Sequence, residues 1–241
     1  MALLTFPGAG RVLAAHGPEL PQPDQLCGPF SARIALHAVL PEAQVPPIGP
    51  LAVAAGTAIW PYEVAWLRPA GAPLDRTGWD DLPRAPSVQT SGTDAAGLLA
   101  GLDATVGDRI AVVPVPGAEL TAYQLRTLLH AIGHSPHPIG VLANVRTGPI
   151  ALPGTDWDVG HFVVLCAVDP DLDEVTVADT YAELGAAGTS PGCRRVPSAA
   201  LTEALAMPPA RGLLLLVRTT DRKVTEVMVA GTGLATGIWN T

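Results

Sequence analysis

Residues 160–179 read GHFVVLCAVDPDLDEVTVAD and contain the pattern that decides the fold. A β-branched apolar run at 160–168 is followed by a turn-forming segment at 169–173 and by a second β-branched run at 174–179. This order indicates an antiparallel hairpin. Three further short β-branched segments are bounded by Gly, Pro or Asp: 141–145, 213–219 and 224–229. We therefore predict a meandering antiparallel sheet in the last hundred residues.

Helical patterns dominate the first half of the chain. Cys27-Gly28-Pro29 opens one helix, with Pro29 in its first turn, and Pro41 stops this helix after Leu40. Two further helices and one buried strand are predicted here: the helices at 94–103 and 118–132, the strand at 110–115. Because helices come first and strands second, without regular alternation, the sequence predicts an α+β fold.

The chain of 241 residues is long enough for one substantial domain. We expect a single domain over residues 1–241, with a helix-rich lobe over about 1–135 and a strand-rich lobe over about 136–241. The segment 41–92 is dense in Pro and Gly, and we expect it to form loops with short strands or helical turns.

The composition excludes several classes of protein. Hydrophobic residues make up 48% of the chain and charged residues 15%, which excludes a disordered chain or a coiled coil. The net charge of −8 argues against nucleic-acid binding, because such binding normally needs a basic face. No apolar run reaches the roughly 20 residues of a membrane span. Three cysteines do not suggest a disulfide framework, and no secretion signal is recognisable, so we expect a cytoplasmic protein without nucleic-acid or membrane partners.

Cys27 is the first candidate for catalysis because the chain enters a helix at this residue. The free N–H groups and the positive dipole end of a helix favour a thiolate, which is the nucleophilic form of cysteine. A buried structural cysteine is the alternative interpretation. Cys166 lies five residues after His161, on the opposite face of the predicted strand, and is expected to be structural. Cys193 lies in a Gly/Pro-rich loop without a nearby histidine and is the weaker candidate.

His161 and Asp179 are the candidate partners of the thiol. A hairpin that turns at 169–173 brings Asp179 back beside His161, and an even offset places both side chains on one face of the sheet. A carboxylate in that place would hold the tautomer of the imidazole and stabilise the imidazolium. The alternative is a surface histidine and an aspartate that merely ends a strand. We predict that Cys27, His161 and Asp179 form a catalytic triad.

Three segments resemble the papain-like cysteine enzymes, in particular their bacterial C39-like branch: Gln22-Pro23-Asp24-Gln25-Leu26-Cys27-Gly28-Pro29-Phe30, Gly160-His161-Phe162-Val163-Val164 and Val177-Ala178-Asp179-Thr180. In that superfamily the cysteine opens a helix, the histidine opens a strand, and an Asn or Asp lies on the next strand. Cys27 and His161 are also separated by about the 130–150 residues of the papain pattern. The resemblance implies a helical N-terminal lobe packed on an antiparallel sheet lobe.

The resemblance further implies an oxyanion-hole glutamine about six residues before the cysteine, where this chain has Pro21. Gln22 and Gln25 are the available substitutes, and Gln25 is preferred because it is nearer. The main-chain N–H of Cys27 is expected to be the second donor. Asp179 stands where asparagine is commoner, a replacement that the family tolerates.

A histidine cluster near the end of the helix predicted at 118–132 is the competing signal. His130 and His134 are four residues apart and share a helical face, with His137 nearby, so this spacing can suit a metal. Gly133 and Pro136 interrupt the helix, however, and no Cys or carboxylate lies close in sequence. We therefore expect a solvated helix end and no metal site.

The predicted triad forms a thioacyl-enzyme, and the acceptor decides the reaction. Water would make the protein a peptidase or amidase, an amine a transferase, and an internal carbanion a carbon–carbon cyclase. The apolar content suits an apolar acyl substrate, and the Ala- and Arg-rich composition, with Lys223 as the only lysine, resembles actinobacterial proteins. In this respect the chain resembles the small cysteine-dependent Dieckmann cyclases of actinobacteria. Those enzymes release a carrier-bound β-ketoacyl-aminoacyl thioester as a tetramate or pyridone.

This resemblance implies that the substrate is thioesterified to a phosphopantetheine carrier protein of polyketide or nonribosomal peptide biosynthesis, and that no cofactor is needed. Because carrier proteins are usually acidic, docking would need hydrophobic contact or an arginine patch such as Arg194, Arg195 and Arg211. The alternatives are an intracellular C39-like cysteine peptidase or amidase, and a papain-like binding module whose cysteine is not catalytic.

Overall fold

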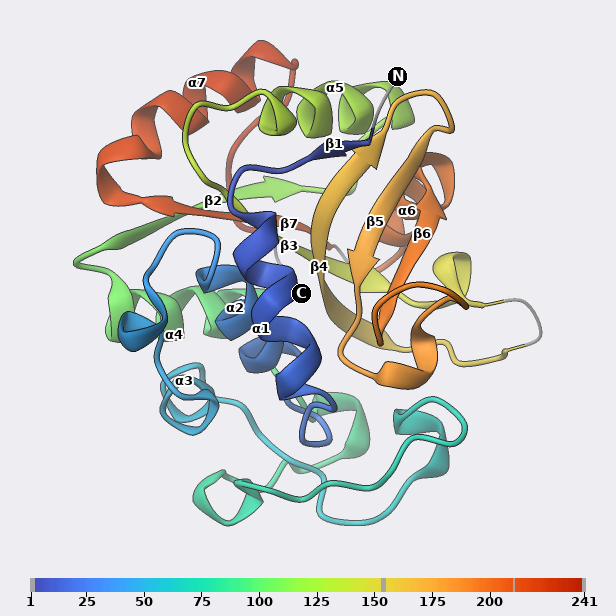
Figure 1. The fold of residues 1–241 in the computed structure, drawn as a ribbon. Helices are drawn as coiled ribbons and strands as arrows, with labels where there is room; N and C mark the ends of the chain where they lie inside the picture. Colours follow the sequence, from blue (N-terminus) through green and yellow to red (C-terminus); the bar gives the residue numbers. More distant parts are fainter. Residues whose placement is uncertain (1–2, 153–154, 210, 240–241) are drawn as a thin grey trace.

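The computed structural model describes residues 3–152, 155–209 and 211–239 (Figure 1). In these residues a seven-stranded antiparallel sheet has the order β2-β7-β3-β4-β5-β6, and β1 pairs with β4 outside this path. The strands are β1 Leu4–Thr5, β2 Ile110–Pro116, β3 Gly140–Arg146, β4 Gly160–Asp169, β5 Glu174–Ala178, β6 Cys193–Pro197 and β7 Gly212–Arg218. The predicted α+β class and the antiparallel sheet are confirmed.

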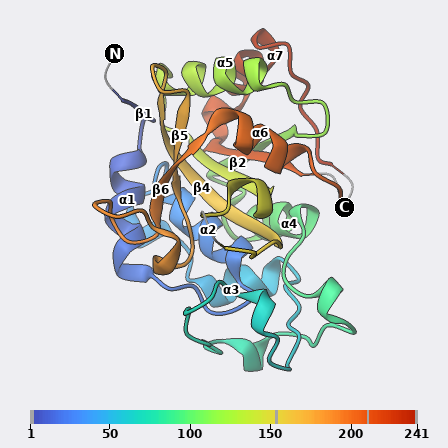
Figure 2. The ribbon, with the colours of Figure 1, turned by 90° about the vertical axis from the view of Figure 1, so that its right-hand side faces the viewer.

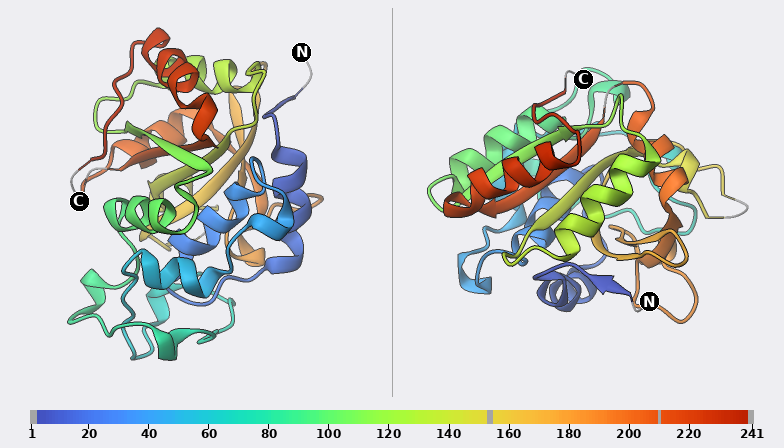
Figure 3. Two further views of the ribbon diagram at one scale, coloured as in Figure 1. Left: turned by 90° about the vertical axis from the view of Figure 1, so that its left-hand side faces the viewer. Right: turned by 90° about the horizontal axis from the view of Figure 1, so that it is seen from above.

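Helices cover both faces of the sheet. They are α1 Ala9–Glu19, α2 Cys27–Leu36, α3 Ile48–Ala54, α4 Ala95–Val106, α5 Ala122–Gly133, α6 Ser198–Ala206 and α7 Arg222–Gly231. The first four pack together on one face, and the last three pack on the other (Figures 2 and 3). Consistent with this arrangement, every residue from Gly212 to Val217 is buried in β7, which lies between β2 and β3. No helix among the described residues has the length and apolar character needed to cross a bilayer.

The hairpin of β4 and β5 forms as the two β-branched runs and the turn segment between them predict. Val164 pairs with Ala178 and Leu165 with Val177, and a bulge at Cys166 shifts the register in the middle of the hairpin. Continuing this register places Asp179 opposite Val163, two residues from His161, and residues two apart on a strand share a face. The offset that the sequence suggested is therefore present.

Helix α2 lies directly on the sheet. It packs on β3 and β4, and the hydroxyl of Ser31 donates a 2.9 Å hydrogen bond to the carbonyl of Phe162. Gly140 in β3 permits this approach, because a Cβ atom at that position would lie 2.4 Å from the carbonyl oxygen of Ala35. This close packing fixes the N-terminal residue of α2, Cys27, over the beginning of β4.

The prediction of a strand at 224–229 is wrong, because these residues belong to helix α7. The valines suggested a strand, but the buried residues are Thr225 and Val229, four apart, whereas Val224 and Val227 are exposed. That spacing belongs to one face of a helix. The division into a helix-rich first and a strand-rich second part is also only approximate, because β1 and β2 join the sheet and α6 and α7 lie in the second part.

Other boundaries differ in smaller ways. The helix predicted to reach Leu40 ends at Leu36, before a short turn. The helix predicted from residue 118 begins at Ala122, because the side chain of Thr121 caps it by accepting a hydrogen bond from the N–H of Gln124. Five of the described helices and strands carried no clear sequence pattern: β1, α1, α3, β6 and α6.

Replacing Gly140 by alanine tests the contact between α2 and the sheet. Because the added methyl group collides with a main-chain oxygen, we expect Gly140→Ala to lower the free energy of unfolding by about 1–3 kcal/mol. Gly49→Ala is the matched control, since a Cβ at Gly49 meets no atom within 4 Å. Urea unfolding followed by circular dichroism measures both changes. Equal stability of the two variants would contradict the close approach.

Candidate active site

Cys27 is the first residue of α2 and is half-buried. Its thiol accepts main-chain hydrogen bonds from Phe162 on β4 and from Gly28 on its own helix. The helix start supplies the unpaired N–H groups and the positive dipole end that favour a thiolate. The site therefore lies where a helix N-terminus meets the start of a strand.

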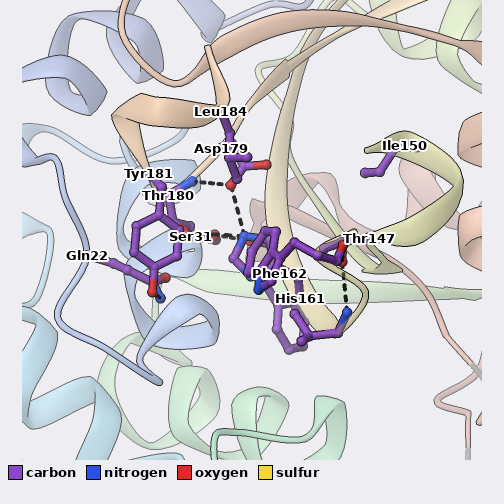
Figure 4. A network of polar contacts seen from close by, with 12 residues as sticks. Gln22, Ser31, Thr147, Ile150, His161, Phe162, Asp179, Thr180, Tyr181 and Leu184 are labelled. Atoms are coloured by element: carbon purple, nitrogen blue, oxygen red, sulfur yellow. Dashed lines mark hydrogen bonds and ion pairs between the residues drawn. The ribbon is translucent and has the colours of Figure 1, made fainter. Parts of the chain in front are cut away.

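His161, the second residue of β4, faces this thiol and is only 3% exposed. Its Nε2 atom lies 2.9 Å from Oδ1 of Asp179 and 3.2 Å from the hydroxyl oxygen of Thr180 (Figure 4). The imidazole also shares a side-chain hydrogen bond with Cys27. Because Nε2 is occupied, Nδ1 is the ring nitrogen that remains for the thiol. The imidazole thus bridges the thiol and the carboxylate.

Asp179 directly follows β5, and its side chain is completely buried. Besides His161, its Oδ1 atom accepts a 2.8 Å hydrogen bond from the main-chain N–H of Thr180 (Figure 4). Its Oδ2 atom accepts a 2.9 Å bond from Arg194, which lies on β6 and is 4% exposed. The structure therefore brings Cys27, His161 and Asp179 together and adds Arg194 behind them.

The charged forms of Cys27, His161 and Asp179 stabilise one another. Burial alone would raise the pKa of Cys27, but the hydrogen bond and charge of His161 and the two main-chain bonds hold it below its usual value. Burial alone would lower the pKa of His161, but the charge and hydrogen bond of Asp179, together with Cys27, raise it to about 9. Burial alone would raise the pKa of Asp179, but His161 and Arg194 lower it to about 2. These directions favour a thiolate on Cys27 and a proton on His161 beside a charged carboxylate.

Two aromatic rings enclose the imidazole. The ring of Trp157 meets that of His161 edge-on, with centroids 5.0 Å apart, and the ring of Tyr181 lies nearly parallel at 6.4 Å. Trp157 and Tyr181 are themselves in edge-on contact at 5.9 Å. These rings keep water away from the bonds between His161 and Asp179, which strengthens the electrostatic interactions there.

The two glutamines differ in their contacts. Both ends of the Gln25 amide bind the main chain of Trp60, at 2.9 Å and 2.7 Å, so this side chain holds a loop. Gln22 is 3% exposed, and its amide nitrogen donates a 3.0 Å bond to the hydroxyl of Tyr181 (Figure 4). An amide nitrogen carries two hydrogens, so a second donor remains on Gln22. The amide of Gln25 is thus committed to the main chain of Trp60, whereas Gln22 keeps one amide hydrogen that the bond to Tyr181 does not use.

The Pro- and Gly-rich segment 41–92 braces the residues that lead into α2. The indole N–H of Trp79 donates a 3.0 Å bond to the carbonyl of Asp24, and the main-chain N–H of Asp24 donates a 2.8 Å bond to Asp75. The carboxylate of Asp24 accepts a 3.1 Å bond from the hydroxyl of Tyr181 and lies 3.6 Å from the guanidinium of Arg68. This segment thus fixes the approach of the chain to Cys27.

The remaining cysteines have different surroundings. Burial raises the pKa of Cys166, and burial together with the charge of Asp179 raises the pKa of Cys193. Both stay thiols, whereas the pKa of Cys27 is lowered. The expectation that Cys193 lies in a loop without a nearby histidine is wrong, because Cys193 opens β6 and its Sγ atom lies 3.9 Å from Nδ1 of His16.

The rings of His130 and His134 lie at the end of α5 with centroids 4.3 Å apart and planes inclined by 41°. The described residues contain no group of three or more His, Cys, Asp or Glu side chains placed to hold a metal.

Sequence reasoning missed three residues of the site: Trp157, Tyr181 and Arg194. Tyr181 lies two positions after Asp179. Arg194 and Arg195 occupy successive positions of a strand, so only one can face inward, and the alternation was the available signal.

The expected arginine patch for carrier docking is not present, because Arg194 is bound to Asp179 and Arg211 is 6% exposed. Arg195 is partly exposed but lies 3.3 Å from Asp169.

The fold and site define an α+β protein in which a half-buried thiol, a buried imidazole and a buried carboxylate lie together where a helix meets an antiparallel sheet. The family described as "Family of unknown function (DUF6885)" matches residues 6–240, and the chain belongs to this family. A comparison with curated proteins found no match.

Replacing Asp179 by asparagine tests its electrostatic role. The loss of the negative charge lets burial dominate, so the pKa of His161 should fall from about 9 to below its usual value. Arg194 also loses its buried partner, and we expect a loss of about 3–5 kcal/mol in the free energy of unfolding. Asp108→Asn, which breaks the exposed pair with Arg109, should cost at most about 1 kcal/mol.

Histidine NMR titration and urea unfolding measure these effects. Since folding raises the pKa of His161, its contribution to wild-type stability is complete below its ordinary pKa and is lost as the pH rises through about 9. Asp179→Asn should abolish this loss of stability. An unchanged pKa of His161 in Asp179→Asn would contradict the assigned role.

Proposed function

We propose that the protein is a thiol enzyme that forms a thioacyl-enzyme at Cys27. The observation that carries the proposal is that Cys27 alone of the three cysteines has a lowered pKa and shares a hydrogen bond with an imidazole held by a buried carboxylate. A binding module has no need of an activated thiol beside such a pair. The antiparallel sheet with α2 at the site supports a papain-like arrangement.

The first half of the reaction follows from this geometry. The thiolate of Cys27 attacks the carbonyl carbon of a bound thioester or amide, and the oxygen of the tetrahedral intermediate receives hydrogen bonds from the N–H of Cys27 and the amide of Gln22. The imidazolium of His161 then gives its proton to the departing thiol or amine. The products are a neutral imidazole and an acyl group on Cys27. Asp179 holds the imidazole in the orientation that presents Nδ1 to the sulfur.

For the second half we propose Dieckmann cyclisation of a β-ketoacyl-aminoacyl group delivered by a phosphopantetheine carrier protein. The neutral imidazole of His161 removes the acidic proton from the carbon between two carbonyls. The carbanion attacks the thioester carbonyl, a carbon–carbon bond forms and the carbon–sulfur bond breaks. Cys27 leaves as thiolate beside a protonated His161, so the starting state is restored. The product is a tetramate or pyridone, and the aromatic enclosure of His161 disfavours attack by water.

An assay with a synthetic aminoacyl β-ketothioester tests both halves. Intact-mass spectrometry should detect the acyl group on wild-type protein and none on Cys27→Ala. Cys193→Ala is the matched control and should be acylated as wild type is, because that buried thiol has a raised pKa. Cyclic product without free acid is expected. If free acid is the sole product, the protein is a hydrolase, a peptidase or amidase, and the cyclisation proposal fails. If Cys27 is not acylated, the enzyme proposal fails and a binding module is the remaining interpretation.

A further inference from the structure

Arg211 is a buried cation beside the candidate active site, and it has no ion-pair partner among the described residues. It immediately precedes β7 and is 6% exposed. Its Nη1 atom donates a 3.1 Å bond to the neutral side-chain carbonyl of Asn144, and its buried Nε atom has no partner. Within the described part of the chain, no carboxylate lies within ion-pair distance of this guanidinium. A buried charge without a counter-charge is costly, so such an arrangement needs a reason.

The nearby charges do not supply the missing partner. The charge of Asp158 reaches Arg211, but Asp158 is not within ion-pair distance of it and instead forms a two-pronged pair with Arg146 at 2.6 Å and 3.1 Å. It also accepts a 3.1 Å bond from the main-chain N–H of Gly148. Arg146 therefore has its own partner, and Arg211 is left as the positive charge in excess.

The guanidinium also lies next to the reacting groups. A Cβ atom at Gly160 would lie 3.2 Å from Nη1 and 3.5 Å from Nη2 of Arg211, so the guanidinium rests against the residue that precedes His161. The absence of a side chain at Gly160 leaves the room that Arg211 occupies. The charge of Arg211 is also close enough to interact with the thiolate of Cys27. A substrate bonded to Cys27 therefore has this cation within its reach.

We propose that Arg211 binds a carboxylate on the acyl part of the substrate, close to the carbonyl that Cys27 attacks. This inference rests on the proposed function, and it adds an anionic substrate class to it. The planar guanidinium suits a carboxylate, which can accept two parallel hydrogen bonds. The phosphate of a carrier arm is not the intended anion, because it lies at the far end of the arm from the thioester.

Two alkylating reagents that differ only in charge test the proposal. Iodoacetate and iodoacetamide attack the same thiolate, so the ratio of their rates cancels any change in the pKa of Cys27. We expect Arg211→Gln to lower the ratio of iodoacetate to iodoacetamide rates about tenfold, as the loss of a charge-assisted bond implies. Arg211→Lys keeps the charge without the planar fork and should give an intermediate ratio. Arg218→Gln, at the exposed opposite end of β7, should leave the ratio unchanged.

A second measurement is independent of the reactivity and of the folding of Arg211→Gln. In Cys27→Ala, with Arg211 intact, NMR titration should show binding of hexanoate and much weaker binding of hexanamide. If both reagents alkylate Cys27 rapidly and the ratio of their rates is unchanged in Arg211→Gln, the role of Arg211 is overturned. The assignment of Cys27 as the nucleophile is then retained. Equal binding of hexanoate and hexanamide also overturns the role of Arg211. If Cys27 reacts with neither reagent, the proposed function fails. In that case the hexanoate titration alone tests whether Arg211 binds a carboxylate.

Discussion

The completely buried carboxylate of Asp179 lies between two cationic groups, the imidazolium of His161 and the guanidinium of Arg194. Each of these charges would be unfavourable alone in the interior, and each is stabilised by the others. The imidazolium in turn stabilises the thiolate of Cys27. The remaining features of the site stabilise these interacting charges. The aromatic rings of Trp157 and Tyr181 shield it, and the strands β4, β5 and β6 place its members side by side.

The position of the thiol depends on a different constraint, the close packing of α2 on the sheet. Gly140 allows the helix to approach β3, and the bond from Ser31 to Phe162 ties it to β4. The residues before the helix are held by the loops of segment 41–92 through Asp24. A thiol on the helix and an imidazole on the sheet thus keep a fixed relation, which general acid–base chemistry requires.

Local sequence patterns predicted the parts of this structure that depend on local rules. The two β-branched runs and the turn between them in 160–179 predicted the hairpin and the proximity of His161 to Asp179, and the helix-start pattern predicted the position of Cys27. The valines of α7 predicted a strand because only two residues of this helix, Thr225 and Val229, are buried, too few to give a visible helical period. The sequence could not predict that Arg194 binds Asp179 or that Gln25 binds the main chain of Trp60. These contacts depend on which strand and which loop lie beside the two side chains. Such contacts between distant segments are set by the tertiary fold.

The central claim is that Cys27 and His161 exist as a thiolate–imidazolium pair. The ultraviolet absorbance of the thiolate, measured against pH as the difference between wild type and Cys27→Ser, tests it most directly. The account predicts that the absorbance of Cys27 appears below the ordinary thiol pKa of about 8.5 and that His161→Ala shifts its appearance to higher pH. A thiolate that forms only at or above that value, with no effect of His161→Ala, would contradict the account.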